Sequence, residues 1–439
     1  MSEYESSFNP ENEVTSAENC YARIGKGGSA EGMPRDMLVV DTGQPTLPSM
    51  EKRSPRTVEE VDELYRETIR GGIVDHHSID AAVLNMPEGA VRRCAAKMVA
   101  DFPSEVVALI KDRDIRSVSG HTDSDLDSIT ATYLTKTLVD SRDAASLPGF
   151  TERLGDFVNL VDYGRFSETD PDKVVQSLMG YFGALKSQTL GRMGAEIGAV
   201  WRSADIPQGE KPARAQAISD KFHGEMMKHM FTVYNACVKA ESAGKTIDFT
   251  NLDAADLTLP ADTKKLLDAG KEQVRADIEA FNKEFEVAEQ TRVVVKTKEG
   301  ADLEVPLVIF GHTQLSPLLV TNMSYSRMPP ETIVAAYAGQ ERTKGGDCYD
   351  VGIKPESLDL FNLTFLEVPL NDAERAKREP LIAAGNGLEA WTTLRKGKEY
   401  LGHGDPTVAV AGGSLIAASN TSLLSSEEFR AVLMNAFQR

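Results

Sequence analysis

The sequence predicts an α/β protein in which a parallel sheet carries helices on both faces, followed by a helical insertion and a smaller C-terminal α+β domain. Three apolar runs resemble strands and end abruptly in polar residues, over residues 36–43, 71–78 and 115–125. Segments with helical character separate them, and strands that alternate with helices pair in parallel. Loops at the carboxyl ends of such strands form the binding crevice, so we expect the three polar clusters to converge.

Capping residues and apolar spacing predict the helices around these strands. We expect helices over residues 54–70, 103–113, 125–140 and 151–164. Thr57 and Ser104 stand near the start of the first two and are expected N-caps, because their hydroxyls accept hydrogen bonds from exposed backbone N–H groups. These elements predict a metal-binding α/β domain over residues 36–170.

The rest of the chain divides into two further regions, after a polar, flexible tail over residues 1–35. Apolar residues recur at three- and four-residue spacing over residues 171–289, which predicts the helical insertion. Beyond it, two β-rich runs flank the letters "KEG", which predicts a hairpin. Ser425 or Ser426 is expected to cap a last helix. We therefore expect a C-terminal α+β domain over residues 290–439.

Composition and charge limit the classes of partner. A formal net charge of −19 argues against binding along a long nucleic-acid duplex. The N-terminus lacks a signal-peptide pattern and no stretch approaches the roughly 20 apolar residues that span a bilayer, so we expect a cytoplasmic protein without a membrane partner. The four cysteines lie far apart, which fits a reducing compartment without a disulfide framework.

The polar clusters contain side chains that bind divalent cations. His121, Asp125 and Asp127 stand at i, i+4 and i+6 where the third strand enters a helix. One imidazole and two carboxylates suit Mn²⁺ or Mg²⁺, with Zn²⁺, Co²⁺ or Fe²⁺ as alternatives. Aspartates in such loops are also common helix caps, so a pair of them is by itself weak support for a metal site.

Two other turns carry acids and histidines. Asp41 ends the first strand, and residues 75–77, Asp-His-His, end the second. In an extended chain the two histidines would point to opposite sides, so that one could bind a metal while the other meets substrate or orients a neighbour. Several acids in one crevice repel each other and lose hydration, and divalent cations remove that cost. If the three turns meet, two metals with an attacking hydroxide between them are the expected outcome.

These motifs resemble those of the DHH phosphoesterases, a superfamily that includes family II manganese pyrophosphatases, exopolyphosphatases and nucleases that trim short oligonucleotides. Residues 75–77 match the triplet that names the superfamily, and "GHTDSDLDSITA" (120–131) is similar to its first motif. "VVDTG", with Asp41, is similar to the second motif. Asp162 is the candidate for the fourth, with Asp156 as the alternative. The order is permuted, since the first motif here follows the triplet.

The resemblance implies a site with two Mn²⁺ ions, or Mg²⁺ or Co²⁺ in their place. The implied metal ligands are Asp41, His76, His121, Asp125, Asp127 and Asp162. His121 and Asp125 would hold one metal, Asp41 would bridge both, and the remaining three would hold the second. His77 would face the substrate phosphate, and Asp75 would orient the histidines.

Members of this superfamily carry a second domain that closes over the metals and supplies cations or a Gly-rich loop to the substrate. The candidates for this role are Arg395, Lys396, Lys398, His403, Gly412, Gly413 and Ser414. Backbone N–H groups of a Gly-rich turn can bind phosphate oxygens. A solvated basic turn before a buried strand would show the same pattern, so both interpretations stay open.

The expected function is that of a metal-dependent phosphoesterase. Metal-activated water would attack phosphorus in a small phosphorylated substrate, such as a nucleotide, a short oligonucleotide or polyphosphate. Phosphodiesterase or exopolyphosphatase-like activity is favoured over a dedicated pyrophosphatase, because the helical insertion makes the chain longer than a compact pyrophosphatase needs. The alternative is a non-catalytic protein of similar fold that binds a nucleotide or a partner. The insertion could restrict access, form a homodimer or bind a partner.

Overall fold

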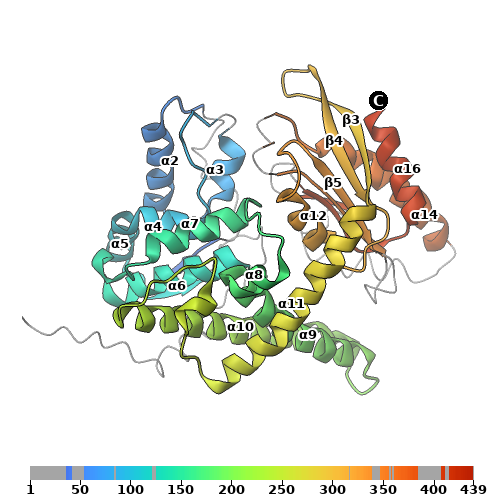
Figure 1. The fold of residues 1–439 in the computed structure, drawn as a ribbon. Helices are drawn as coiled ribbons and strands as arrows, with labels where there is room; N and C mark the ends of the chain where they lie inside the picture. The colour runs from blue at the N-terminus through green and yellow to red at the C-terminus, as the bar shows by residue number, and fades with distance from the viewer. Residues whose placement is uncertain are drawn as a thin grey trace, which may run out of the picture. The chain divides into compact units, whose positions relative to one another are not determined.

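The structure is a computed structural model that describes residues 36–41, 54–83, 86–120, 125–315, 317–338, 347–354, 357, 360–383, 407–410 and 415–438. The chain divides into two compact units (Figure 1). The first unit comprises Met1–Asp162 and Thr169–Ala276, and the second comprises Tyr163–Glu168 and Asp277–Arg439. The helical region that follows the predicted α/β domain therefore belongs to the first unit as far as Ala276.

The strand-like runs of the first unit pair in parallel, which confirms the mixed α/β class. β1 (Met37–Val39) pairs with β2 (Ser117–Ser119). Val40, directly after β1, forms a parallel bridge with Val74 in the second run, residues 71–78. The two bridged valines are fully buried. All three runs thus lie side by side, with the first in the middle, and they end in the same direction.

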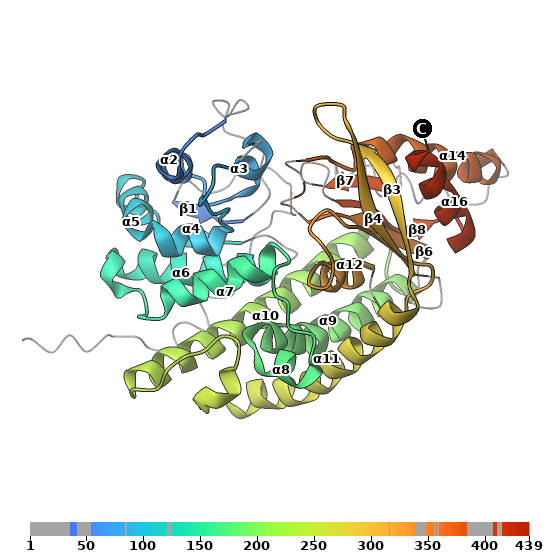
Figure 2. The same ribbon diagram turned by 45° about the horizontal axis from the view of Figure 1, so that its top comes forward.

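Helices make up most of the first unit. They are α2 (Val58–Arg70), α3 (His77–Ala82), α4 (Ala95–Asp101), α5 (Pro103–Asp112), α6 (Leu126–Ser141), α7 (Thr151–Asp162), α8 (Pro171–Gln176), α9 (Leu178–Arg202), α10 (Lys211–Ser242) and the first part of α11 (Ala261–Val287). α4, α6 and α7 pack against one another (Figure 1). α9 and α10 lie along each other (Figure 2). Among the described residues, no helix is both long enough and apolar enough to cross a bilayer.

The helix starts confirm one predicted cap and correct another. The Thr57 side chain accepts a hydrogen bond from the backbone N–H of Glu60 and caps α2, as expected. The prediction for Ser104 is wrong, because α5 already begins at Pro103 with Phe102 at the N-cap. Proline has a fixed φ and no N–H to satisfy, so it suits the first helical position and places the cap at Phe102, two residues before Ser104.

The second unit is built on a six-stranded sheet with the order β3-β4-β5-β6-β8-β7. Its strands are β3 (Glu289–Lys296), β4 (Asp302–Phe310), β5 (Ile333–Ala338), β6 (Asp347–Gly352), β7 (Thr407–Val410) and β8 (Leu415–Ser422). β3 and β4 form the expected antiparallel hairpin, with Gly300 in its turn at a φ of +84° that glycine adopts without strain. β4 and β5 are parallel, and the remaining pairs are antiparallel.

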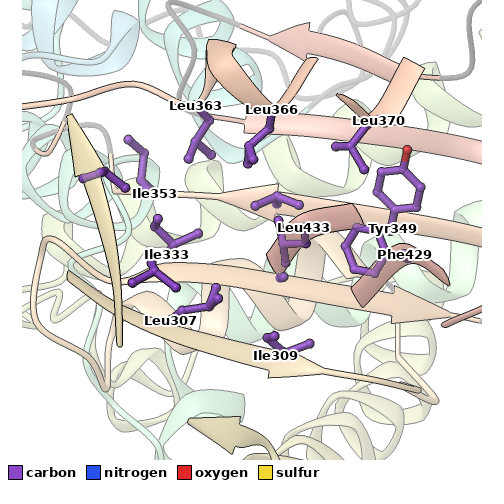
Figure 3. Packing of buried hydrophobic residues seen from close by; sticks show 14 of the residues in the cluster. Leu307, Ile309, Ile333, Tyr349, Ile353, Leu363, Leu366, Leu370, Phe429 and Leu433 are labelled. Atoms are coloured by element: carbon purple, nitrogen blue, oxygen red, sulfur yellow. The ribbon is translucent and has the colours of Figure 1, made fainter. Parts of the chain in front are cut away.

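Two layers of helix cover the two faces of this sheet. α14 (Glu367–Ala383) and α16 (Ser426–Phe437) pack on one face, where Phe429 stacks on Tyr349 with ring centroids 4.4 Å apart (Figure 3). The last part of α11, together with α12 (Pro317–Tyr325), packs on the other face of the sheet. Ser425 caps α16 in a reciprocal capping box, which decides between the two serines that the sequence left open.

Phe429→Ala tests the core that α16 forms with the sheet. The ring of Phe429 is fully buried, so we expect a loss of about 3–5 kcal/mol in the free energy of unfolding. Chemical denaturation measures this loss. The matched control is Phe365→Ala, since Phe365 is 39% exposed and its truncation should cost less. Equal losses in the two variants would contradict the described packing.

Asp350 is a buried acid of this unit. It lies on β6 beside Tyr349, 8% exposed, and alternation along the strand directs it to the opposite face. Burial raises the pKa of the Asp350 carboxyl to about 7. The folded chain therefore favours the protonated form. This preference stabilises the folded protein fully below about pH 4, which is the pKa of an aspartate in the unfolded chain. The stabilisation is lost as the pH rises through 7.

Asp350→Asn should remove this pH dependence, because the amide stays neutral. Relative to wild type, we expect the variant to gain about 3 kcal/mol in free energy of unfolding between pH 5 and pH 8. Denaturation of both proteins at the two pH values measures the difference. A difference that stays constant with pH would show that the carboxyl is not held neutral in the folded protein.

Candidate metal centre

Three turns of the first unit bring their acidic and imidazole side chains together, as the sequence predicts. Asp41 follows β1, and its backbone N–H donates to the Val74 carbonyl at 2.9 Å, so the first turn lies against the start of the second. Asp41 has a φ of 49°, which is uncommon for a residue other than glycine. Asp127 lies in the first turn of α6 after β2, and Asp162 is the last residue of α7.

One ring nitrogen of His76 faces three carboxylates. Its Nε2 lies 3.8 Å from Asp41 Oδ1, 3.8 Å from Asp127 Oδ2 and 3.6 Å from Asp162 Oδ2. These separations are longer than hydrogen bonds. They match the roughly 3–4 Å between ligand atoms that share one ion at about 2.1 Å. Imidazole and carboxylate donors at this spacing therefore fit a divalent cation.

The ligand atoms form two overlapping groups in the part of the chain that the structure describes. Asp41, His76 and His77 make one group, and His76, Asp127 and Asp162 make the other. Within each group the ligand atoms all lie within 4.8 Å of one another. Asp41, His76 and Asp127 are buried, whereas the Asp162 side chain is 24% exposed. The site is thus closed on most sides, and Asp162 lies toward solvent.

The two adjacent histidines lie side by side, with ring centroids 4.2 Å apart. The expectation that they point to opposite sides is wrong. His76 is the N-cap of α3 with φ −92° and ψ −19°, so the pair lies in helical rather than extended backbone. Successive side chains in a helix are about 100° apart instead of 180°. The His77 side chain is the more exposed of the two, at 17% against 7% for His76.

Asp75 holds the ring of His77. Its Oδ1 accepts a hydrogen bond from the His77 backbone N–H at 2.9 Å and lies 2.8 Å from His77 Nδ1. Burial would raise the pKa of the Asp75 carboxyl, but the hydrogen bonds and charge of His77, with the charge of His76, outweigh it and lower the pKa. Asp75 is thus an ionised partner that fixes the orientation of His77.

Asp127 is held by the first turn of α4. Its Oδ2 accepts from the Ala95 N–H at 2.9 Å, and its Oδ1 accepts from the Ala96 N–H at 2.7 Å. Burial, followed by the charges of Asp41 and Asp162, raises the pKa of Asp127 well above its usual range. The carboxylates therefore repel one another, and a cation among them would remove that repulsion.

The second ring nitrogen of His76 also meets an acid. His76 Nδ1 lies 2.7 Å from Asp80 Oδ2. Burial lowers the pKa of His76, but the charge and hydrogen bond of Asp80, with the charges of Asp162 and Asp127, raise it well above its usual value. The imidazole is thus surrounded by carboxylates on both edges, and positive charge in this pocket is strongly favoured.

The other residues proposed from the sequence either belong to neither ligand group or lie outside the described residues. Asp125 caps α6 with its side chain and belongs to neither ligand group among the described residues. Asp156 is 59% exposed and pairs with Lys97 at 2.7 Å, so Asp162 is the one that joins the cluster. His121 lies outside the described residues. So do the substrate-binding candidates Arg395, Lys396, Lys398, His403, Gly412, Gly413 and Ser414.

Sequence reasoning missed three polar residues that contact the ligands or their supports, namely Asp80, Arg92 and Asn159. Asp80 stands four residues after His76, a spacing that places both on one face of a helix. This spacing would have pointed to Asp80 if the start of α3 at His77 had been known from the sequence. Neither Arg92 nor Asn159 lies in a recognisable motif, so only the folded chain reveals them.

Mn²⁺ should stabilise the folded protein through this cluster. At free Mn²⁺ of 100 times the Kd, we expect about 2.7 kcal/mol of added stability, reversed by EDTA. His76→Gln should abolish the effect, because His76 belongs to both ligand groups. Thermal unfolding with and without Mn²⁺ measures it.

The control is His229→Gln. His229 is equally buried, but its Nδ1 lies 2.9 Å from Thr263 Oγ1, and among the described residues it joins neither ligand group. This variant should keep the full response to Mn²⁺. An unchanged response in His76→Gln would show that the cation binds elsewhere.

Comparisons with known proteins neither assign nor exclude a family. No family model matches the chain, no curated protein matches it, and no solved structure matches it. The case for function therefore rests on the geometry and electrostatics of the described residues.

Proposed function

We propose that this protein is a metal-dependent phosphoesterase of the DHH type. It hydrolyses a phosphoanhydride or phosphodiester bond in a small phosphorylated substrate, such as a nucleotide, a short oligonucleotide or polyphosphate. The observation that carries the proposal is the approach of three carboxylates to His76 Nε2 at 3.6–3.8 Å. Buried acids at this spacing are costly unless a cation holds them together.

The donor set indicates the metal. Carboxylate oxygens outnumber imidazole nitrogens, and no cysteine belongs to the ligand groups of the described residues. Mixed oxygen and nitrogen ligands favour Mn²⁺, with Mg²⁺ or Co²⁺ as alternatives. Bound divalent ions would supply Lewis-acid stabilisation of phosphate charge and activation of water.

His77 is the residue of the cluster best placed to meet substrate. It is more exposed than His76, and Asp75 fixes its ring through Nδ1 at 2.8 Å. The ionised Asp75 keeps a proton on Nδ1 of His77, so the ring orientation and tautomer are set before substrate arrives. An imidazole held in this way can donate to a phosphate oxygen or pass a proton to the leaving group.

Phosphate release with Mn²⁺ tests the proposal. The substrates are pyrophosphate, a short polyphosphate, and a dinucleotide whose product a phosphatase then cleaves. We expect turnover of at least one of them, and a loss of kcat of about 100-fold or more in His77→Asn with little change in Mn²⁺ affinity. His76→Gln should lose both activity and Mn²⁺ binding, which separates the two roles.

Two results would contradict the enzyme hypothesis. Equal activity in wild type and His76→Gln would trace the turnover to a contaminant or to another site. Tight Mn²⁺ and nucleotide binding without turnover of any substrate would favour the non-catalytic alternative, in which the site binds a nucleotide or holds a partner.

A further inference from the structure

A segment without any candidate ligand contacts three parts of the metal cluster. Residues 92–96, here called the 92–96 segment, run into the first turn of α4. The segment reaches His76 through Asp80, Asp127 through two backbone N–H groups, and α7 through Asn159. It thus connects parts of the chain that supply three different ligands.

The first connection runs through an arginine. Arg92 is 5% exposed, and its Nη1 donates to Asp80 Oδ1 at 3.1 Å. The other oxygen of Asp80 lies 2.7 Å from His76 Nδ1. A carboxylate on Nδ1 fixes the ring and keeps its proton there. Nε2 is then the nitrogen directed at the three metal-binding carboxylates.

The second connection fixes the helix that ends in Asp162. Asn159 Nδ2 donates to the Arg92 carbonyl at 2.9 Å, and Asn159 Oδ1 accepts from the Cys94 N–H at 2.7 Å. Asn159 is 5% exposed and precedes Asp162 by three residues on α7. Residues three apart lie on the same side of a helix. The amide therefore ties the last turn of α7 to the same segment.

The third connection is to Asp127. The Ala95 and Ala96 N–H groups donate to its two oxygens at 2.9 Å and 2.7 Å. Both N–H groups belong to the first turn of α4, which has no partners for them within the helix. Each carboxylate oxygen keeps lone pairs beyond the one that accepts an N–H. Asp127 can therefore be held in orientation and still bind a cation.

We propose that Asp80, Arg92 and Asn159 are positioning residues, which act through the 92–96 segment to hold His76, Asp127 and Asp162 in one fixed arrangement. The inference rests on the proposed metal site. It assigns a role to polar residues that no motif marks, and it gives the buried arginine beside the acidic cluster a function in holding that cluster.

The neighbouring Arg93 supplies a comparison within the same segment. It is 9% exposed and pairs with Asp62 at 2.8 Å and Asp101 at 2.7 Å. Arg92 and Arg93 are therefore both buried and both paired with carboxylates. Only the pair of Arg92 continues to a candidate ligand. Loss of either arginine removes a cation from partly buried carboxylates, so both losses destabilise the fold, but only one should disturb the metal site.

Titration calorimetry with Mn²⁺ tests the inference in the full chain. Asp80→Asn, Arg92→Gln and Asn159→Leu should each weaken Mn²⁺ binding about 10–100-fold. Arg93→Gln is the matched control, and its Kd should stay within about twofold of wild type. Unfolding temperatures without metal show whether the variants are destabilised to a similar degree.

The outcomes separate the inference from the proposed function. The positioning role would be overturned if the Asp80 and Asn159 variants bound Mn²⁺ with wild-type affinity. It would also be overturned if Arg92→Gln and Arg93→Gln lost affinity equally. Either result would leave the metal site standing. Failure of wild type itself to bind Mn²⁺ would overturn both. If Arg92→Gln does not fold, Asp80→Asn decides, because it keeps the shape of the side chain and removes only its charge.

Discussion

The site depends on one unfavourable interaction, the gathering of three carboxylates, two of them buried, around a single imidazole nitrogen. Asp41, Asp127 and Asp162 approach His76 Nε2 to within 3.8 Å, in a pocket that largely excludes water. Like charges at this distance destabilise the fold unless protons or cations compensate them. The surrounding structure serves to keep these groups together, since parallel strands end at one edge and helix termini hold the acids there.

Buried acids of this protein are accommodated in different ways. In the first unit, Asp75 is kept ionised by His77, and Asp127 receives two backbone N–H groups. In the second unit, Asp350 lies in an apolar layer and is kept neutral by burial. Partnered charges suit the binding of a cation, whereas a neutral carboxyl does not. The groups of side chains that could hold a metal ion all belong to the first unit among the described residues.

Much of the fold could be predicted because its signals are local. Alternating apolar runs and helices predicted the parallel pairing, and Thr57 and one of the two candidate serines, Ser425, are N-caps as expected. The prediction for Ser104 failed because Pro103 competes for the first helical position. The choice between Asp156 and Asp162 could not be made from the sequence. It depends on which turn of α7 faces the strands, and packing decides that.

For the site, the sequence by itself determined which residue types end the strands, and so it predicted Asp41, His76 and Asp127 as members of one cluster. Only the tertiary structure decided how the histidine pair is oriented, since the onset of α3 at this point is not visible in the letters Asp-His-His. The tertiary structure alone also brought Arg92 and Asn159 into contact with the residues that hold the candidate ligands. Those contacts join residues up to 67 positions apart, and no local pattern encodes a contact made by the packing of separate helices.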